Sequence, residues 1–365
     1  MKKQWEEIKV ITVIFVLWRI VLEIIGYFSR TIIPLYPNFL GINHWTNFDG
    51  GHYISIAAGG YHIYQQAFFP FYPILINLLS KILSLPVEMS ALAISHVSIF
   101  IGIILFYKLA ILEHVRSPMW TIIFLLLFPT SFFFIAAYNE SLFLVLAVGM
   151  IYSLKKKRYV IAGILGMLAS ATRLFGVFLI IFPVVQLLTL PKKKIDLNII
   201  WPILLIPLGL IIYMIYLQYS TGDAFAFIHL QSKFGAGRSS GEIILLPQVF
   251  WRYIRIFMYS SRFTLSYIIA IFEMVVFIFS LFALWIGWKK FKLDLSYIIY
   301  SFFVLIVPTF SGTLSSIPRY AISAFPLFFI GGNMHNKWMK LGLAAILASG
   351  LVLSTALFLS GYFIA

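Results

Sequence analysis

This sequence predicts an all-α polytopic membrane protein, and three observations support that fold class. Hydrophobic residues make up 62% of the 365 positions and charged residues 11%, whereas soluble domains have roughly 45–50% and about 25%. The apolar residues occur in long runs, and short basic segments separate these runs. The chain has no cysteine, so disulfides, thiolate metal sites and a thiol nucleophile are excluded.

Membrane-spanning helices are expected wherever about 17–25 apolar residues follow one another. The first run, 8–28, is too long for a signal peptide, and no small-residue cleavage site follows it, so we expect a retained helix. About eleven spans are expected in all. Their approximate ranges are 8–28, 90–112, 119–136, 139–154, 159–173, 174–190, 199–219, 265–288, 294–310, 319–334 and 338–360.

The basic segments predict how these helices are oriented. The net charge is +15, with clusters KKKR at 155–158, PKKK at 191–194 and WKKFK at 288–292. Such clusters mark cytoplasmic loops, so we interpret them as topology signals and not as nucleic-acid sites. With the N-terminus inside, the basic loops all fall on the inner side of the membrane if segment 68–86 does not cross it. Two early prolines in this segment favour an interfacial or re-entrant helix.

Two long connections, 29–89 and 220–264, are then expected on the outer face, together with a short one at 311–318. Long loops on one face of a rigid scaffold commonly carry function. We see no internal repeat, so we expect one integral domain, 1–365. Its active site is expected on the outer face, which is extracytoplasmic or lumenal.

The first outer loop carries one acid among glycines and aromatic residues. Within NFDGGHY, Asp49 is followed by Gly50 and Gly51, then by His52 and Tyr53. The glycine pair permits a sharp turn and a close approach of another molecule to the backbone. Asp49 is therefore a candidate for a chemical role, the alternative being a turn or cap residue. His52 is either an orienting group or an interface histidine.

The second outer loop, TGDAFAFIHLQSKFGAGRSSGE, adds Asp223, Gln231 and Arg238. The segment PQVFWRYIRIF follows it and predicts an interfacial amphipathic helix. Asp223 follows a glycine, so its alternative role is to form a turn.

Three further charged residues are expected near the outer ends of spans, at the level of these loops. They are Glu140, Arg173 and Arg319. Charges near the membrane are costly and are usually paired or functional. Each has a simpler alternative: Glu140, with Asn139, would cap a helix starting at Ser141, and the arginines would be interface anchors.

One base together with several cations suits a particular group transfer. When a sugar moves from a lipid phosphate to an alcohol, the leaving phosphate is already a stable anion, whereas the attacking hydroxyl needs a general base. Glycoside hydrolysis differs, because two carboxylates flank the bond. One acid, Asp49, together with several arginines fits the transfer from a lipid phosphate and not glycoside hydrolysis. The planar guanidinium group of arginine also suits phosphate oxygens.

Five segments of the chain, taken in order, resemble those of one enzyme family. They are FDGGHYISIAAGGY with AFFPFYPILI, PTSFFFIAAYNESLF, AGILGMLASATRLFG, TGDAFAFIHLQSKFG and RYAISAFPLF. With these segments the chain resembles the PIG-V family of mannosyltransferases, within the polytopic glycosyltransferases of the GT-C fold. Phe48, Ala224 and Phe234 stand where this family commonly has Trp, Pro and Trp.

The resemblance implies an inverting transferase that moves a mannose or another hexose from a polyprenyl- or dolichyl-phosphate sugar to a lipid-linked or other hydroxyl acceptor. It also implies that Asp49 is the catalytic base. The expected partners are that donor, a lipid or glycolipid acceptor and membrane lipids. The expected substrate-binding residues are His52, Tyr53, Glu140, Arg173, Asp223, Gln231 and Arg319.

A transporter or flippase of lipid-linked saccharides is the alternative function. Such proteins carry midplane charges, often in inverted repeats, whereas the charges here gather at one face. No cofactor is expected, and no structural metal, because His44, His52 and His62 lack tight ligand spacing. A divalent metal held by Asp49 and a substrate phosphate stays open. The acceptor stays open among a phosphatidylinositol-type lipid, another glycolipid and a protein Ser or Thr.

Overall fold

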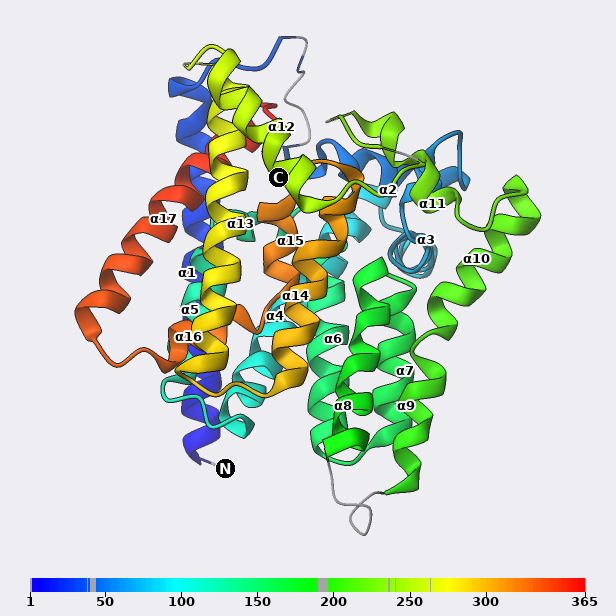
Figure 1. The fold of residues 1–365 in the computed structure, drawn as a ribbon, viewed down its shortest axis with the longest axis vertical. Coiled ribbons are helices and arrows are strands. Elements are labelled where there is room, and N and C mark those ends of the chain that lie inside the picture. The colour runs from blue at the N-terminus through cyan, green and yellow to red at the C-terminus, as the bar shows by residue number, and fades with distance from the viewer. Residues whose placement is uncertain are drawn as a thin grey trace. The chain divides into compact units, whose positions relative to one another are not determined.

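The computed structural model describes residues 2–37, 39, 44–189, 196–235, 237–239, 241–262 and 264–364, and the regular elements among them are all helices. The predicted all-α class is therefore confirmed. The basic segment 191–194 lies outside the described residues. The chain divides into two compact units, and each is built from segments that are distant in sequence. Figure 1 labels the helices of both units. The prediction of a single domain over 1–365 stays a prediction.

The first unit comprises Met1–Gly59, Tyr72–Lys156 and Phe328–Ile364. In it the long α1 packs against α17 and α4, and α4 packs along α6. Phe106 of α4 stacks on Phe329 of α16, with ring centroids 5.1 Å apart. The helices are α1 (Lys2–Ile32), α2 (Asp49–Gly59), α3 (Phe71–Leu83), α4 (Val87–Leu112), α5 (Pro118–Leu127), α6 (Glu140–Lys155), α16 (Leu327–Asn333) and α17 (Lys337–Leu359).

The second unit comprises Gly60–Phe71 and Lys157–Leu327. Here α7 packs against α9 and α10, while α14 packs against α8, α13 and α15. The helices are α7 (Tyr159–Ser170), α8 (Ile181–Thr189), α9 (Ile200–Leu205), α10 (Leu208–Thr221), α11 (Ala226–His229), α12 (Leu246–Tyr259), α13 (Leu265–Lys289), α14 (Leu295–Ile306) and α15 (Ile317–Ser323).

Four helical segments among the described residues are long and apolar enough to cross a membrane. They are Val87–Leu112, Leu197–Thr221, Leu265–Lys289 and Lys337–Leu359. They coincide with four of the expected spans, so the prediction of a polytopic membrane protein is confirmed.

The remaining expected spans include α1 and several shorter helices. The span expected at 119–136 is interrupted after Leu127, where Pro129 has no N–H to continue the helix, and a 3₁₀ turn Ser131–Phe134 follows. The span expected at 319–334 is divided into α15 and α16 around Pro326. The count of about eleven spans therefore stays a prediction.

The two long connections that are expected on the outer face contain helices of their own. The helix α3 occupies the segment for which an interfacial or re-entrant helix was expected. The helix α12 is amphipathic as predicted, because it buries Val249 and Tyr253 while Trp251 and Arg255 are exposed. Ordered helices in these connections give the candidate site residues a fixed backbone.

Candidate active site

Asp49 is the first residue of α2, where a carboxylate is favourably placed relative to the helix dipole. The sharp turn expected at the glycine pair is wrong, because Gly50 and Gly51 lie inside the first helical turn. The chain instead reverses at Phe48, which has a left-handed φ of 54°. Another part of the same chain lies close to the glycine pair. If Gly50 carried a Cβ atom, that atom would lie 3.4 Å from the carbonyl oxygen of Ala137.

The segment before α6 fixes the segment before α2. The amide of Ala137 donates a 2.7 Å hydrogen bond to the Trp45 carbonyl, and the Tyr138 hydroxyl donates a 2.9 Å bond to the Asn47 carbonyl. These contacts join the second motif segment to the residues directly before the first one. They place the start of α2 beside the start of α6, whose first residue is the buried Glu140.

Glu140 begins α6 one residue earlier than expected, and its predicted capping partner does not act as one. The Asn139 side chain makes no capping hydrogen bond to the helix. An acid in the first turn still complements the helix dipole.

His52 and Tyr53 follow Asp49 along α2 and have different surroundings. His52 is half-buried. It follows Asp49 by three residues on α2, so the two side chains share a helix face. Tyr53 is buried and packs edge-on against Tyr72, with centroids 5.2 Å apart. The Tyr72 hydroxyl lies 2.9 Å from that of Ser95 on α4. Tyr53 thus packs α2 against α3, and Tyr72 links α3 to α4. His52 is the more accessible of the two residues.

A network of charged residues inside the expected first span also contacts Trp45, in the segment before α2. Arg19 lies 2.5 Å from the Glu23 carboxylate, and its Nε is 2.8 Å from Nε2 of His96. The Trp45 indole donates a 3.0 Å hydrogen bond to the same Glu23 carboxylate. Because intramembrane charges are costly unless paired, this network anchors Trp45 and with it the approach to Asn47 and α2.

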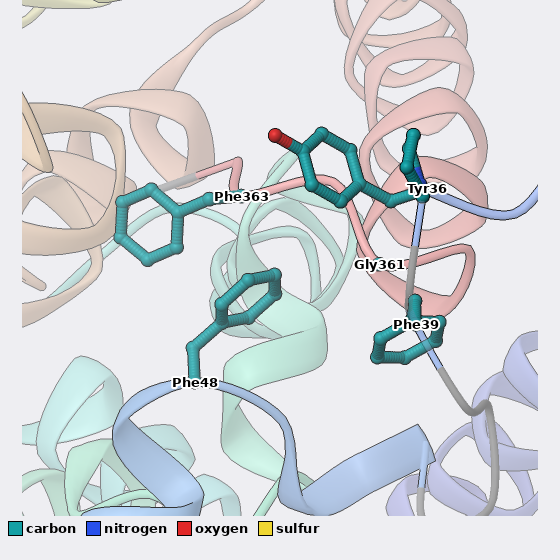
Figure 2. Close-up of a pocket in the computed structure, with 6 residues that line it drawn as sticks. Tyr36, Phe39, Phe48, Gly361 and Phe363 are labelled. Carbon is teal, nitrogen blue, oxygen red and sulfur yellow. The ribbon is translucent and has the colours of Figure 1, made fainter.

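A pocket of about 340 Å³ lies beside Phe48, the residue before Asp49 (Figure 2). The Phe48 ring also contacts Phe358 and Phe363, at centroid distances of 5.7 and 5.2 Å. The apolar lining suits a hydrocarbon chain better than a sugar. The lining residues are Tyr36, Pro37, Phe39, Phe48, Gly361 and Phe363.

In the second unit, two predicted site residues come together around one ring. The guanidinium carbon of Arg173 lies 5.7 Å from the Tyr320 ring centroid, and that of Arg319 lies 5.7 Å from the same centroid. The arginines are only 6% and 8% exposed. Cations over an aromatic face are attracted to its quadrupole. Arginines that act as interface anchors extend to the surface, whereas the side chains of Arg173 and Arg319 are both buried.

Asp223 forms the turn that its sequence position suggests. It follows the α10 C-cap Gly222, and its carboxylate accepts a 2.9 Å hydrogen bond from the Phe225 amide. The other carboxylate oxygen lies 2.7 Å from Nδ1 of His229, and both side chains are largely exposed. The hydrogen bond from His229 lowers the pKa of Asp223 below its ordinary value.

Gln231 links the second outer loop to the helix that carries Arg319. Its side-chain carbonyl accepts a 3.3 Å hydrogen bond from Arg238, and Arg238 also donates a 3.1 Å bond to the Ser316 hydroxyl. Ser316 is the N-cap of α15, so it precedes Arg319 by less than one turn. Gln231 is thus linked through Arg238 to Ser316 at the start of the helix that carries Arg319.

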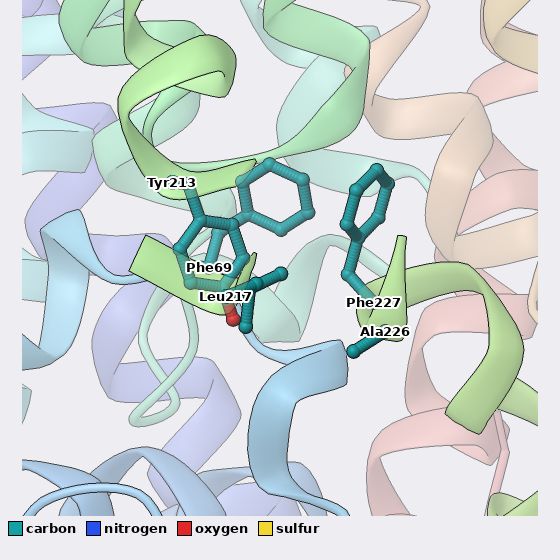
Figure 3. Packing of buried hydrophobic residues seen from close by; sticks show 5 residues of the cluster. All are labelled: Phe69, Tyr213, Leu217, Ala226 and Phe227. Carbon is teal, nitrogen blue, oxygen red and sulfur yellow. The ribbon is translucent and has the colours of Figure 1, made fainter. Parts of the chain in front are cut away.

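Phe69 of the first outer loop packs against α10 and the start of the second outer loop within the same unit (Figure 3). Phe69 contacts Tyr213 and Phe227 at centroid distances of 5.2 and 5.5 Å. The Tyr213 hydroxyl donates a 2.7 Å hydrogen bond to the Gln66 carbonyl. This aromatic cluster brings together two outer segments that the sequence predicted to share a face.

No group of three or more His, Cys, Asp or Glu side chains arranged to hold a metal occurs in the part of the chain that the structure describes. The prediction that no metal is required stays a prediction.

Several residues that build the site were missed by sequence reasoning. Tyr138 and Tyr320 have no individual signal, since both lie in aromatic-rich runs. Glu273 could have been found, because it is an isolated acid inside an expected span. The same holds for Arg19 and Glu23 in the first span.

Comparison with known families supports the resemblance of the first three motif segments, which lie within residues 31–191. The family model described as Mannosyltransferase (PIG-V) matches residues 31–191. No curated protein matches the chain. The matched segment contains Asp49, His52, Tyr53, Glu140 and Arg173. Over residues 31–191, therefore, this chain is similar to the PIG-V family of mannosyltransferases.

Proposed function

We propose that this chain is a GT-C-type glycosyltransferase that transfers a mannose, or another hexose, from a polyprenyl- or dolichyl-phosphate sugar to a hydroxyl group of a lipid-linked acceptor on the outer face. The observation that carries the proposal is the family match over 31–191, because that segment contains the Asp49 motif at the start of α2. A membrane mannosyltransferase requires a sugar donor and a hydroxyl acceptor, and the two groups of site residues suit these two roles.

Asp49 is the general base of the proposed reaction. Its carboxylate takes the proton of the acceptor hydroxyl while that oxygen forms a bond to the anomeric carbon. The bond from this carbon to the phosphate oxygen breaks on the opposite face, so the configuration inverts and the lipid phosphate leaves as an anion. A positioned base accelerates such a step by roughly 100- to 10,000-fold.

Arg173 and Arg319 are the proposed ligands of the donor phosphate. Both are buried beside Tyr320, where interactions between charges are stronger than in water. Guanidinium groups bind phosphate oxygens through paired N–H donors. No general acid is needed on this side, because the departing phosphate is already a stable anion.

The remaining predicted residues are assigned supporting roles. His52 lies one turn after Asp49 and is proposed to orient the base or the acceptor hydroxyl. Tyr53, Glu140, Asp223 and Gln231 are proposed to contact substrate or to hold residues that do.

The proposal is tested with purified protein, a polyprenyl-phosphate mannose and three acceptors: a phosphatidylinositol-type lipid, another glycolipid and a Ser/Thr peptide. We expect transfer to a lipid acceptor, with the product configuration opposite to that of the donor. Retention of configuration would contradict the single-step mechanism. Movement of lipid-linked saccharide across vesicles without any transfer would instead identify a flippase.

A further inference from the structure

The connection that leads into the Arg319 helix is anchored at successive residues. This connection, Gly312 to Ser316, is called the 312–316 loop. The Gly312 carbonyl accepts a 3.0 Å hydrogen bond from Arg252 of α12. The Leu314 amide donates a 3.1 Å bond to the Tyr253 hydroxyl, also on α12. The Ser316 hydroxyl accepts a 3.1 Å bond from Arg238.

The Tyr253 hydroxyl is held by a second group, the carboxylate of Glu273 on α13. The Tyr253 hydroxyl donates a hydrogen bond to Glu273 and therefore presents its oxygen lone pairs to the loop. One accepts from Leu314, and the Thr313 hydroxyl lies 3.3 Å away. Burial and the neighbouring Glu273 raise the pKa of the Tyr253 hydroxyl, so it remains a donor. The direction of this hydrogen-bond chain is thus fixed.

Glu273 interacts with two groups, the Tyr253 hydroxyl through a hydrogen bond and Arg238 through its charge. It lies within a candidate membrane span and is 6% exposed, and a buried carboxylate there is costly unless it is hydrogen-bonded. Its hydrogen bond runs to Tyr253, not to a group of the proposed reaction. The carboxylate therefore serves the arrangement of Tyr253.

The loop is also fixed by its backbone. Gly312 has a φ of 90°, and a Cβ at this position would lie 2.4 Å from Nη1 of Arg252. Any other residue would strain the backbone and displace the arginine. Leu314 is fully buried and Ser316 is 1% exposed. The loop therefore has little freedom to move independently of α12.

The position of this loop determines the position of Arg319. The short helix α15 begins at Ile317, directly after the loop, and Arg319 lies in its first turn. A shift of the loop relative to α12 would move α15, and with it both Arg319 and Tyr320, relative to Arg173. Displacements of about 1 Å are sufficient to impair a binding site.

We propose that Tyr253 and Glu273 are positioning residues that set Arg319 for the phosphate group of the lipid-linked donor. The inference rests on the proposed function, in which Arg319 binds that phosphate. Neither residue touches the donor. Their effect is transmitted through the Leu314 amide and the backbone of the 312–316 loop.

The first test compares Tyr253→Phe with Tyr259→Phe, a matched control on the same helix that removes an exposed hydroxyl. Hydrogen exchange in a peptide covering 312–316 is expected to accelerate in Tyr253→Phe only. The donor KM is expected to rise about three- to tenfold, the range for loss of one hydrogen bond. The kcat and the acceptor KM are expected to stay within about twofold of the parent.

The second test uses Glu273→Gln and Glu273→Leu. Gln keeps a carbonyl oxygen that can accept from Tyr253, so near-parental exchange and donor KM are expected. Leu removes the acceptor and should reproduce the Tyr253→Phe defect. If Gln fails as badly as Leu while both remain folded, the charge itself matters and the positioning role is wrong.

The outcomes separate this inference from the proposed function. Unchanged exchange at 312–316 in Tyr253→Phe overturns the role of the hydroxyl, whatever the reaction is. Faster exchange with an unchanged donor KM, or with kcat and both KM values altered together, overturns the link to the phosphate. If the parent protein transfers no sugar, the proposed function fails, whereas the exchange measurement still decides whether Tyr253 holds the loop.

Discussion

The hydroxyl of Tyr138 donates a 2.9 Å hydrogen bond to the backbone carbonyl of Asn47, which lies 91 residues earlier in the chain. Tyr138 is fully buried, and Asn47 stands two residues before Asp49. This bond joins the motif that starts α2 to the motif that starts α6. It gives the first outer loop a fixed position relative to the helical scaffold.

Tyr138→Phe is expected to destabilise the protein without unfolding it. The variant leaves the Asn47 carbonyl without this donor, and a neutral hydrogen bond contributes about 0.5–1.5 kcal/mol. A lower Tm and a reduced rate of transfer are both expected, because the start of α2 is less constrained. Tyr152→Phe, on the helix α6 that follows Tyr138, is the control. Parental Tm and rate in Tyr138→Phe would show that the bond is dispensable.

The expected topology can be tested directly because the chain has no cysteine. Ile63→Cys, at a position that is 78% exposed, should react with an impermeant maleimide from the outer side. Lys156→Cys, in the exposed basic segment after α6, should react only after the membrane is opened. Labelling of both positions from the same side would contradict the orientation.

The pair formed by Asp223 and His229 predicts a small, pH-dependent stabilisation. The hydrogen bond from His229 lowers the pKa of the Asp223 carboxyl in the folded state. The stabilisation is therefore present above the ordinary Asp pKa of about 3.9, and it is lost as the pH falls through the folded-state pKa. His229→Ala should therefore lower Tm near pH 6, and the difference from the parent should shrink on acidification. His62→Ala, which removes another exposed histidine, is the control. A difference that grows on acidification would have the wrong sign.

Arg319→Lys is expected to impair use of the donor. Lysine keeps the charge but replaces a two-pronged donor by a point charge, and a hydrogen bond to a charged group is worth about 1.5–3 kcal/mol. The donor kcat/KM should fall by about 10- to 150-fold, with folding retained. Arg255→Lys, at an exposed position of α12, should have little effect. A parental donor KM and kcat in Arg319→Lys would remove this residue from the site.

The sequence predicted those features that depend on local composition. Four long apolar runs became the four clear candidate spans, and the alternation of apolar and charged residues in 247–257 became the amphipathic α12. Arg173 and Arg319 were both selected as site residues, because charged residues at the ends of apolar runs are conspicuous.

Features that depend on tertiary packing could not be predicted. The left-handed φ of Phe48 is unusual for an aromatic residue, so the turn was assigned to the glycines beside it. Tyr320 is one of 20 tyrosines, and only the fold shows that two arginines share its ring. Glu273 was overlooked because averaging hydropathy over a whole span hides a single acid.

The central claim concerns Asp49, and Asp49→Asn tests it most directly. The substitution keeps the size and the hydrogen-bonding capacity of the side chain at the start of α2, but removes the base. Sugar transfer from a polyprenyl-phosphate mannose is measured alongside Tm, with Glu242→Gln as a control that neutralises an exposed acid of the second outer loop. We expect parental Tm and a fall in kcat of about 100- to 10,000-fold. A folded Asp49→Asn protein that transfers sugar at the parental rate would contradict the account.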